Sequence, residues 1–132
     1  MSTANANDTH LVDLWNRYLQ AYRDYDACPN AWENPDDHTP EETTLYLQMD
    51  GLEREFEHTP ATTPPGFALK LRHFLRRGVS RPWITDWVIY GKPMRLDNER
   101  ADMERRKMDY GSDFEVTQMA LDLIRQCEQK AT

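Results

Sequence analysis

Metal or acid–base chemistry would first be sought at the four histidines, which are scattered along the chain. They form no HExxH motif, and no local element combines His, Cys and acidic residues at the spacing of a metal site. The nearest approach is Asp36-Asp37-His38, which is a candidate loop ligand set but is more simply explained by a turn rich in Asp and His. The residues predict no metal site.

Nucleophilic and phosphate-binding motifs are also missing from the sequence. There is no GxSxG, P-loop or GxGxxG pattern, and the chain has only five glycines. Glu53 and Glu57 lie four residues apart on one predicted helix face, but general acid–base catalysis needs a pocket that shifts their pKa values. We expect no catalytic residue, no cofactor-binding residue and no cofactor, and therefore a non-enzymatic protein.

The densest basic run is the segment 64–81, which is followed by two tryptophans. Cations beside aromatic rings are the residue types that contact the nucleic-acid backbone and stack on bases. A formal net charge of -7 opposes long-range attraction to nucleic acid. Nucleic-acid binding through this segment is therefore the alternative hypothesis. The candidate contacts, for nucleic acid or for a protein partner, are Lys70, Arg72, His73, Arg76, Arg77, Arg81, Trp83 and Trp87.

Acidic residues dominate the first half of the chain. Residues 1–60 contain 13 acids and three arginines, a net charge of -10, whereas residues 61–132 contain 13 bases and 10 acids, a net charge of +3. An acidic helical face can dock a protein partner, or can simply keep the protein soluble. Protein binding is the leading hypothesis, with an acidic docking face formed by Glu42, Asp50, Glu53 and Glu57. Trp32 lies alone in a turn-rich connection, where it either covers the core or anchors a partner.

Helix start and stop signals predict the elements that carry these residues. Asp8 or Thr9 can cap a first helix, Thr39-Pro40-Glu41-Glu42 is a capping box, and Thr63 precedes the Pro64-Pro65 pair. Ser80 is a candidate N-cap for residues 82–90, where a short strand is the competing prediction, and Gly78 is a candidate C-cap. We predict helices at 9–27, 40–58, 64–77, 82–90 and 113–129, with a charged helix near 97–109.

Apolar periodicity and a mean hydropathy of -0.88 favour an all-α fold, a compact bundle of four to five helices. We expect one domain over residues 1–132, with a flexible terminus at 1–8 and a charged, mobile connection at 92–111. The predicted core comprises Leu11, Trp15, Tyr18, Tyr22, Leu45, Met49, Leu52, Phe56, Phe67, Leu71, Phe74, Val116, Ala120, Leu123 and Ile124.

Several features predict a cytoplasmic protein. No apolar run approaches the length of a membrane span, so no membrane partner is expected, and the first ten residues do not resemble a signal peptide. Cys28 and Cys127 stand far apart in the sequence and are most simply two small apolar side chains. A redox pair is the alternative if the two helix ends meet.

One block of the sequence resembles a group of known proteins. The residues LxxxMDGLEREFEHTPATT, followed by PPGFALKLR, resemble small helical proteins of uncharacterised function carried by bacterial prophages and other mobile elements. The resemblance covers residues 10–77 and a terminal helix at Asp113–Glu128, and it assigns no catalytic residue. It implies a phage or mobile-element setting, in which small acidic proteins regulate or inhibit host machinery, including defence nucleases.

Overall fold

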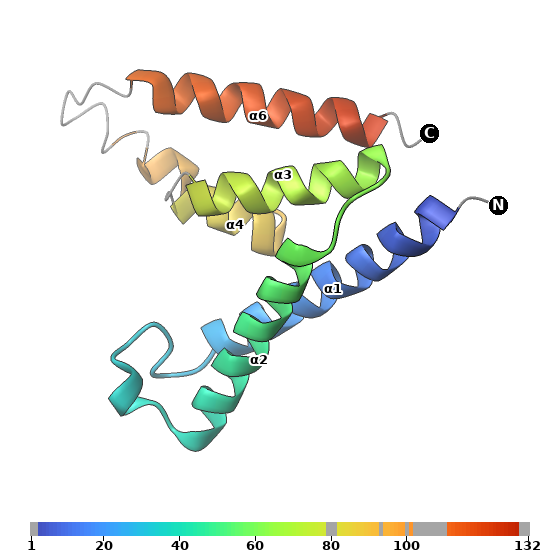
Figure 1. The fold of residues 1–132 in the computed structure, drawn as a ribbon. Helices are drawn as coiled ribbons and strands as arrows, with labels where there is room; N and C mark the ends of the chain where they lie inside the picture. The colour runs from blue at the N-terminus through green and yellow to red at the C-terminus, as the bar shows by residue number, and fades with distance from the viewer. Residues whose placement is uncertain (1–2, 79–81, 93, 100, 102–110, 130–132) are drawn as a thin grey trace. The chain divides into compact units, whose positions relative to one another are not determined.

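The computed structural model describes residues 3–78, 82–92, 94–99, 101 and 111–129, all of which are helical or irregular (Figure 1). The predicted all-α class is confirmed. Residues 96–99 and 101 are helical, as the charged-helix prediction requires, and the rest of that predicted helix lies outside the described residues. The elements are α1 (Thr3–Asp26), the 3₁₀ helix η1 (Pro35–Asp37), α2 (Pro40–His58), α3 (Pro64–Gly78), α4 (Pro82–Tyr90) and α6 (Gly111–Gln129).

The chain divides into two compact units, Met1–Gly66 and Phe67–Thr132, here called the N-terminal and C-terminal units. The boundary falls close to the point at which the charge balance of the sequence changes sign. The expectation of a single domain stays a prediction, and each unit is described by itself.

The local signals place the helix boundaries well. α2 has the predicted bounds, and its capping box forms because the Thr39 and Glu42 side chains each accept the other's backbone N–H. Residues 82–90 are helical rather than extended. That helix ends at Gly91, which has a φ of 78° and donates its N–H to the Trp87 carbonyl oxygen. The candidate cap Ser80 lies outside the described residues.

Two predicted caps are wrong. α1 begins at Thr3, so neither Asp8 nor Thr9 caps it, and residues 3–8 are part of this helix. Residues 3–7 contain no proline or glycine that would stop the helix. Gly78 is the last residue of α3 and does not adopt the positive φ expected of a C-cap glycine.

Asp8 has a tertiary role instead. Its carboxylate accepts hydrogen bonds from the Thr62 N–H at 2.8 Å, from the Thr62 hydroxyl at 3.0 Å and from the Thr63 hydroxyl. Burial raises the pKa of Asp8, but these hydrogen bonds outweigh it and leave the pKa below its ordinary value. Gly66 lies against the same carboxylate, because a Cβ at this position would lie 2.7 Å from an Asp8 carboxylate oxygen. The chain leaving α2 is thereby fixed to α1.

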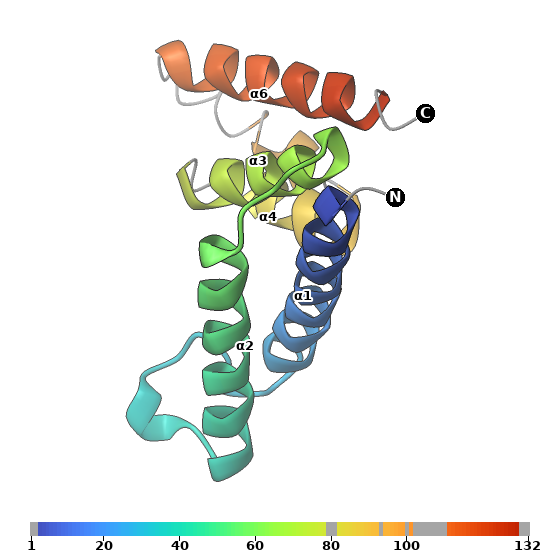
Figure 2. The same cartoon turned by 45° about the vertical axis from the view of Figure 1, so that its right-hand side comes forward.

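The core of the N-terminal unit lies between α1 and α2, which run alongside each other (Figure 2). The Trp15 and Phe56 rings are 5.0 Å apart, and Phe56 is fully buried. Burial of such rings is a large favourable term in folding. The predicted core residues that are buried in this unit are Leu11, Trp15, Tyr18, Tyr22, Met49, Leu52 and Phe56, whereas Leu45 is half-buried.

In the C-terminal unit, the predicted buried face of α3 is wrong. Phe67 and Phe74 are 47% and 72% exposed, whereas Ala68, His73 and Leu75 are buried. α3 carries two apolar stripes, 67/71/74 and 68/71/75, and periodicity alone cannot choose between them. Leu71 and Ala120 are half-buried, Leu123 is exposed, Ile124 is fully buried, and the side chain of Val116 lies outside the described residues.

In the C-terminal unit, a buried carboxylate is paired with an arginine. Asp86 is buried on α4, and its carboxylate accepts two N–H groups of the Arg95 guanidinium at 2.6 and 2.8 Å. It also accepts the Arg95 backbone N–H. Bidentate pairs of this kind are among the stronger hydrogen bonds in proteins. This pair holds the chain that follows Gly91 against α4.

Candidate partner-binding surface

The connection between α1 and α2, residues 27–39, is built around one buried carboxylate. Glu42 is 2% exposed and accepts the Asn30 backbone N–H at 2.8 Å, the Asn30 side-chain amide at 3.0 Å and the Thr39 N–H at 2.9 Å. The Thr39 backbone and Asn30 side-chain hydrogen bonds lower the pKa of Glu42 to about 2. Glu42 therefore stays charged and ties the connection to the first turn of α2.

This role removes Glu42 from the predicted acidic docking face. Glu53 is also engaged internally, because it accepts the Tyr18 hydroxyl at 2.9 Å. Asp50 forms an ion pair with Arg54 at 3.2 Å, and Glu57 is exposed. The four acids identified by helical spacing thus serve different purposes, and two of them hold the unit together.

A cluster of rings lies at the same end of the α1–α2 pair. Tyr25 is its centre: its ring centroid lies 4.8 Å from that of Trp32, 5.7 Å from that of His38 and 5.5 Å from that of Tyr46. Its hydroxyl oxygen accepts the Trp32 backbone N–H at 3.1 Å and lies 2.9 Å from Nε2 of His38. Tyr25 itself is almost completely buried, so it is a fixed support for the residues around it.

Trp32 is packed against the unit and is also exposed. Its ring packs on Tyr22 and Tyr25, and its indole N–H donates to the Asp26 carboxylate at 2.7 Å. The residue is nevertheless 52% exposed. Its φ is 63°, a left-handed backbone that is an outlier for a bulky residue. The contacts with Tyr25 and Asp26 hold this conformation in place.

Two further apolar side chains are exposed on the adjoining turn of α2. Tyr46 is 40% exposed and contacts Tyr25, and its sequence neighbour Leu47 is 62% exposed. We call Trp32 and Tyr46, which both contact Tyr25, the apolar patch. Of these residues only Trp32 was predicted from the sequence, because no local signal marks the exposure of Tyr46 and Leu47 on α2.

The patch belongs to a strongly acidic segment. Residues 24–42 contain seven carboxylates and no lysine or arginine. Glu42 is buried, but the other six are on exposed residues: Asp24, Asp26, Glu33, Asp36, Asp37 and Glu41. The electrostatic potential of such a surface favours cations over anions.

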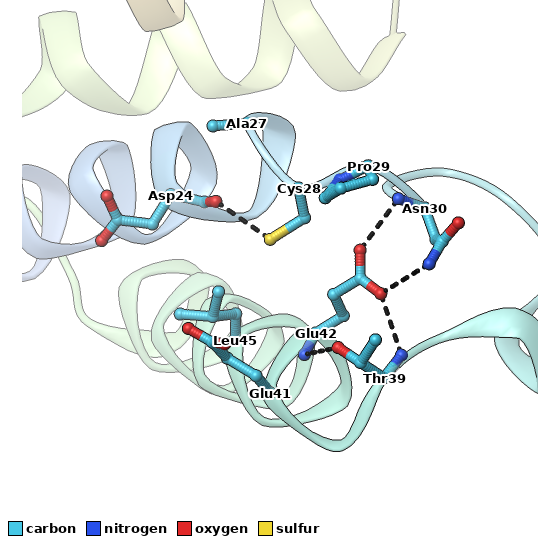
Figure 3. Close-up of a pocket in the computed structure, with 9 residues that line it drawn as sticks. All are labelled: Asp24, Ala27, Cys28, Pro29, Asn30, Thr39, Glu41, Glu42 and Leu45. Atoms are coloured by element: carbon cyan, nitrogen blue, oxygen red, sulfur yellow. Dashed lines mark hydrogen bonds between the residues drawn. The ribbon is translucent and has the colours of Figure 1, made fainter.

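An open hollow of about 580 Å³ lies beside the same connection (Figure 3). Its lining includes Cys28, Glu41 and Leu45 but not Trp32. Burial raises the pKa of the Cys28 thiol, and the carboxylates of Glu42, Glu41 and Asp24 raise it further. Because the thiolate is the reactive form, this environment disfavours nucleophilic or redox chemistry at Cys28. Both cysteines are free thiols.

The basic residues predicted as contacts are partly occupied within the C-terminal unit. The Arg72 guanidinium lies 4.4 Å from the ring centroid of Trp87 and 2.5 Å from a Glu128 carboxylate oxygen. His73 is 5% exposed, so it lies in the interior rather than on a basic surface. Lys70, Arg76, Trp83 and Trp87 are half-buried, and Arg77 is exposed. Arg81 lies outside the described residues.

Comparisons with protein families, with curated proteins and with solved structures found no match. Among the described residues, no three His, Cys, Asp or Glu side chains are grouped as a metal site would require. None of the helices in this part of the chain is long and apolar enough to span a bilayer. The surface around Trp32 is the arrangement that most resembles a binding site.

Proposed function

We propose that this protein is a non-enzymatic protein-binding module that acts through its N-terminal unit. The observation that carries the proposal is the exposure of Trp32, Tyr46 and Leu47 beside a segment with six exposed acidic residues. Exposed apolar side chains that gather within a charged surround are characteristic of protein interfaces. The buried carboxylates Asp8 and Glu42 support a non-catalytic reading, because their oxygens accept structural hydrogen bonds.

The proposal includes the setting that the block of residues 45–72 implies. The partner is a host protein or nucleoprotein machine, such as a defence nuclease, that a phage or mobile-element protein regulates or inhibits. Proteins that bind nucleic acid carry basic surfaces. A unit with a net charge of -10 over residues 1–66 is complementary to such a surface.

The alternative is a nucleic-acid-binding accessory protein that acts through the basic segment 64–81. The exposure of Arg77 supports it. The engagement of Arg72 with Trp87 and Glu128 weighs against it, because a phosphate would have to displace contacts that the chain already makes.

Affinity capture from bacterial lysate with the tagged full chain separates the two hypotheses. The capture is run with and without nuclease and at two salt concentrations. A specific protein recovered after nuclease treatment is the expected result. Nucleic acid alone, lost as the salt concentration rises, would contradict the proposal and favour the basic segment.

A charge-reversal variant makes the comparison sharper. Arg76→Glu with Arg77→Glu reverses two cations of α3 while leaving the Arg72 contacts in place. This variant should retain the protein partner if the N-terminal unit binds it, provided that circular dichroism shows an unchanged helix content. Loss of the partner from a folded variant would place the contact on α3 instead.

A further inference from the structure

We propose that the apolar patch of Trp32 and Tyr46 is a docking surface for an arginine- or lysine-rich segment of the partner protein. This inference rests on the proposed function and deepens it, because it names the surface and the chemistry of what the surface binds. It also assigns Trp32 as the main anchor.

Trp32 is held in its exposed position at a conformational cost. A positive φ is unfavourable for a residue with a large side chain, and it persists only where other contacts enforce it. Here the Tyr25 hydroxyl binds the Trp32 backbone and Asp26 binds the indole N–H. The ring is thereby immobilised before any partner arrives, which lowers the entropy cost of binding.

The Trp32 ring keeps area that a partner can contact. The ring centroids of Tyr22 and Tyr25 lie 5.2 and 4.8 Å from that of Trp32, and about half of the residue is still exposed. An indole face attracts a cation more strongly than the other aromatic side chains do. The same chain shows this geometry in its C-terminal unit, where the Arg72 guanidinium lies over Trp87 at 4.4 Å.

The charges around Trp32 are complementary to a basic segment. Six exposed acidic residues and no lysine or arginine lie within residues 24–42, and Asp26 is hydrogen-bonded to the Trp32 ring. A guanidinium or ammonium group therefore gains both a π face and nearby carboxylates. A nucleic acid or an acidic peptide would be repelled by the same groups.

A titration of the full chain with an oligo-arginine peptide tests the inference. The indole N–H resonances are followed in ¹⁵N–¹H spectra, and the resonance missing in Trp32→Gly identifies Trp32. Glycine adopts a positive φ without strain, so this variant removes the ring while preserving the backbone. Phe74→Ala, which removes an exposed ring from the other unit, is the matched control.

The expected result is a shift of the Trp32 indole resonance and a peptide affinity about fivefold weaker in Trp32→Gly, with Phe74→Ala unchanged. An oligo-glutamate peptide and a single-stranded oligonucleotide should leave the resonance in place. Equal affinity in Trp32→Gly and the parent chain would overturn the inference. A response to the oligonucleotide, or a shift confined to the Trp83 and Trp87 resonances, would also overturn it.

Affinity capture with Trp32→Gly distinguishes a failure of this inference from a failure of the proposed function. If Trp32→Gly still captures the protein that the parent chain captures, the docking surface is wrong but the protein-binding module stands. If no protein is captured while the peptide titration gives the expected shift, the surface chemistry stands and the proposed function fails.

Discussion

The two units of this protein stabilise buried carboxylates by different means. In the N-terminal unit, Asp8 accepts hydrogen bonds from Thr62 and Thr63, and Glu42 accepts them from Asn30 and Thr39, so every donor is neutral. In the C-terminal unit, the buried carboxylate of Asp86 is met by the cation Arg95. The first arrangement keeps the negative charge of the unit, whereas the second neutralises it. A unit built in the first way can be compact and still present a strongly acidic surface.

The units also differ in where their aromatic side chains lie. α1 and α2 bury Trp15, Tyr18 and Phe56 between them, and only the patch at their connection is exposed. On α3, Phe67 and Phe74 are exposed instead. Aromatic rings therefore stabilise the N-terminal unit, and on α3 the same residue type contributes little to stability.

The largest expected effect tests this difference with one substitution in each unit. Phe56→Ala should lower the free energy of unfolding by about 3–5 kcal/mol, because it removes a fully buried ring that packs on Trp15. Phe74→Ala should change it by less than about 0.5 kcal/mol. Urea denaturation followed by circular dichroism measures both. A large loss of stability in Phe74→Ala would show that the Phe74 ring is packed against other side chains.

The next effect concerns acid stability in the N-terminal unit. Folding lowers the pKa of Glu42 from 4.5 to about 2, so its contribution to stability is complete above about pH 4.5 and is lost as the pH falls toward 2. Glu42→Gln should lower the denaturation midpoint at neutral pH and make stability less dependent on pH in this window. Glu41→Gln, on the exposed side of the same turn, is the control. Parallel pH profiles for Glu42→Gln and the parent chain would refute the role given to Glu42.

In the C-terminal unit, Arg95→Ala should cost about 2 kcal/mol, because it leaves the buried Asp86 carboxylate without its charged donor. The cost is below that of a fully buried pair because the Arg95 side chain is partly exposed. Adding Asp86→Asn should recover part of the loss, since no charge then stays buried. Arg54→Ala, which breaks the Asp50 ion pair on α2, should cost less than about 0.5 kcal/mol in the same denaturation assay.

The smallest effects are expected at two glycines of the N-terminal unit and should have opposite signs. Gly51→Ala should stabilise α2 by about 0.5–1 kcal/mol, because the new methyl group meets nothing within 4 Å. Gly66→Ala should destabilise by about 1 kcal/mol, because its Cβ would press on the Asp8 carboxylate that Thr62 and Thr63 hold in place. Thermal midpoints would reveal the signs. A stabilising Gly66→Ala would mean that Asp8 is not fixed there.

Much of the secondary structure could be predicted because its signals are local. The Thr39 capping box and the prolines at positions 40, 64 and 82 lie within a few residues of the helix starts that they determine, and Gly91 lies beside the helix end that it caps. The start of the first helix was predicted several residues too far along the chain, because aspartate is a common N-cap residue. The Asp8 carboxylate is used by threonines more than 50 residues away, which no local pattern reports.

The candidate site was predictable only in part. Trp32 was predicted either to cover the core or to anchor a partner. The structure shows that Tyr25 binds its backbone while half of the residue stays exposed, and the anchor role stays a prediction. The acidic docking face was predicted from helical spacing. Spacing shows which residues are neighbours on a helix, but not which tertiary contacts their side chains make. Glu42 was assigned to that face, but it is buried and is bound by Asn30, which lies twelve residues away along the chain.

The sequence by itself determined the helical class, most helix boundaries and the opposite charge balance of the two halves, since these depend on backbone preferences and on composition. Only the tertiary structure decided which side chains are buried. α3 has two apolar stripes of similar strength, and the packing left Phe67 and Phe74 exposed. Burial depends on what meets each face, and that information belongs to the whole fold rather than to any one segment.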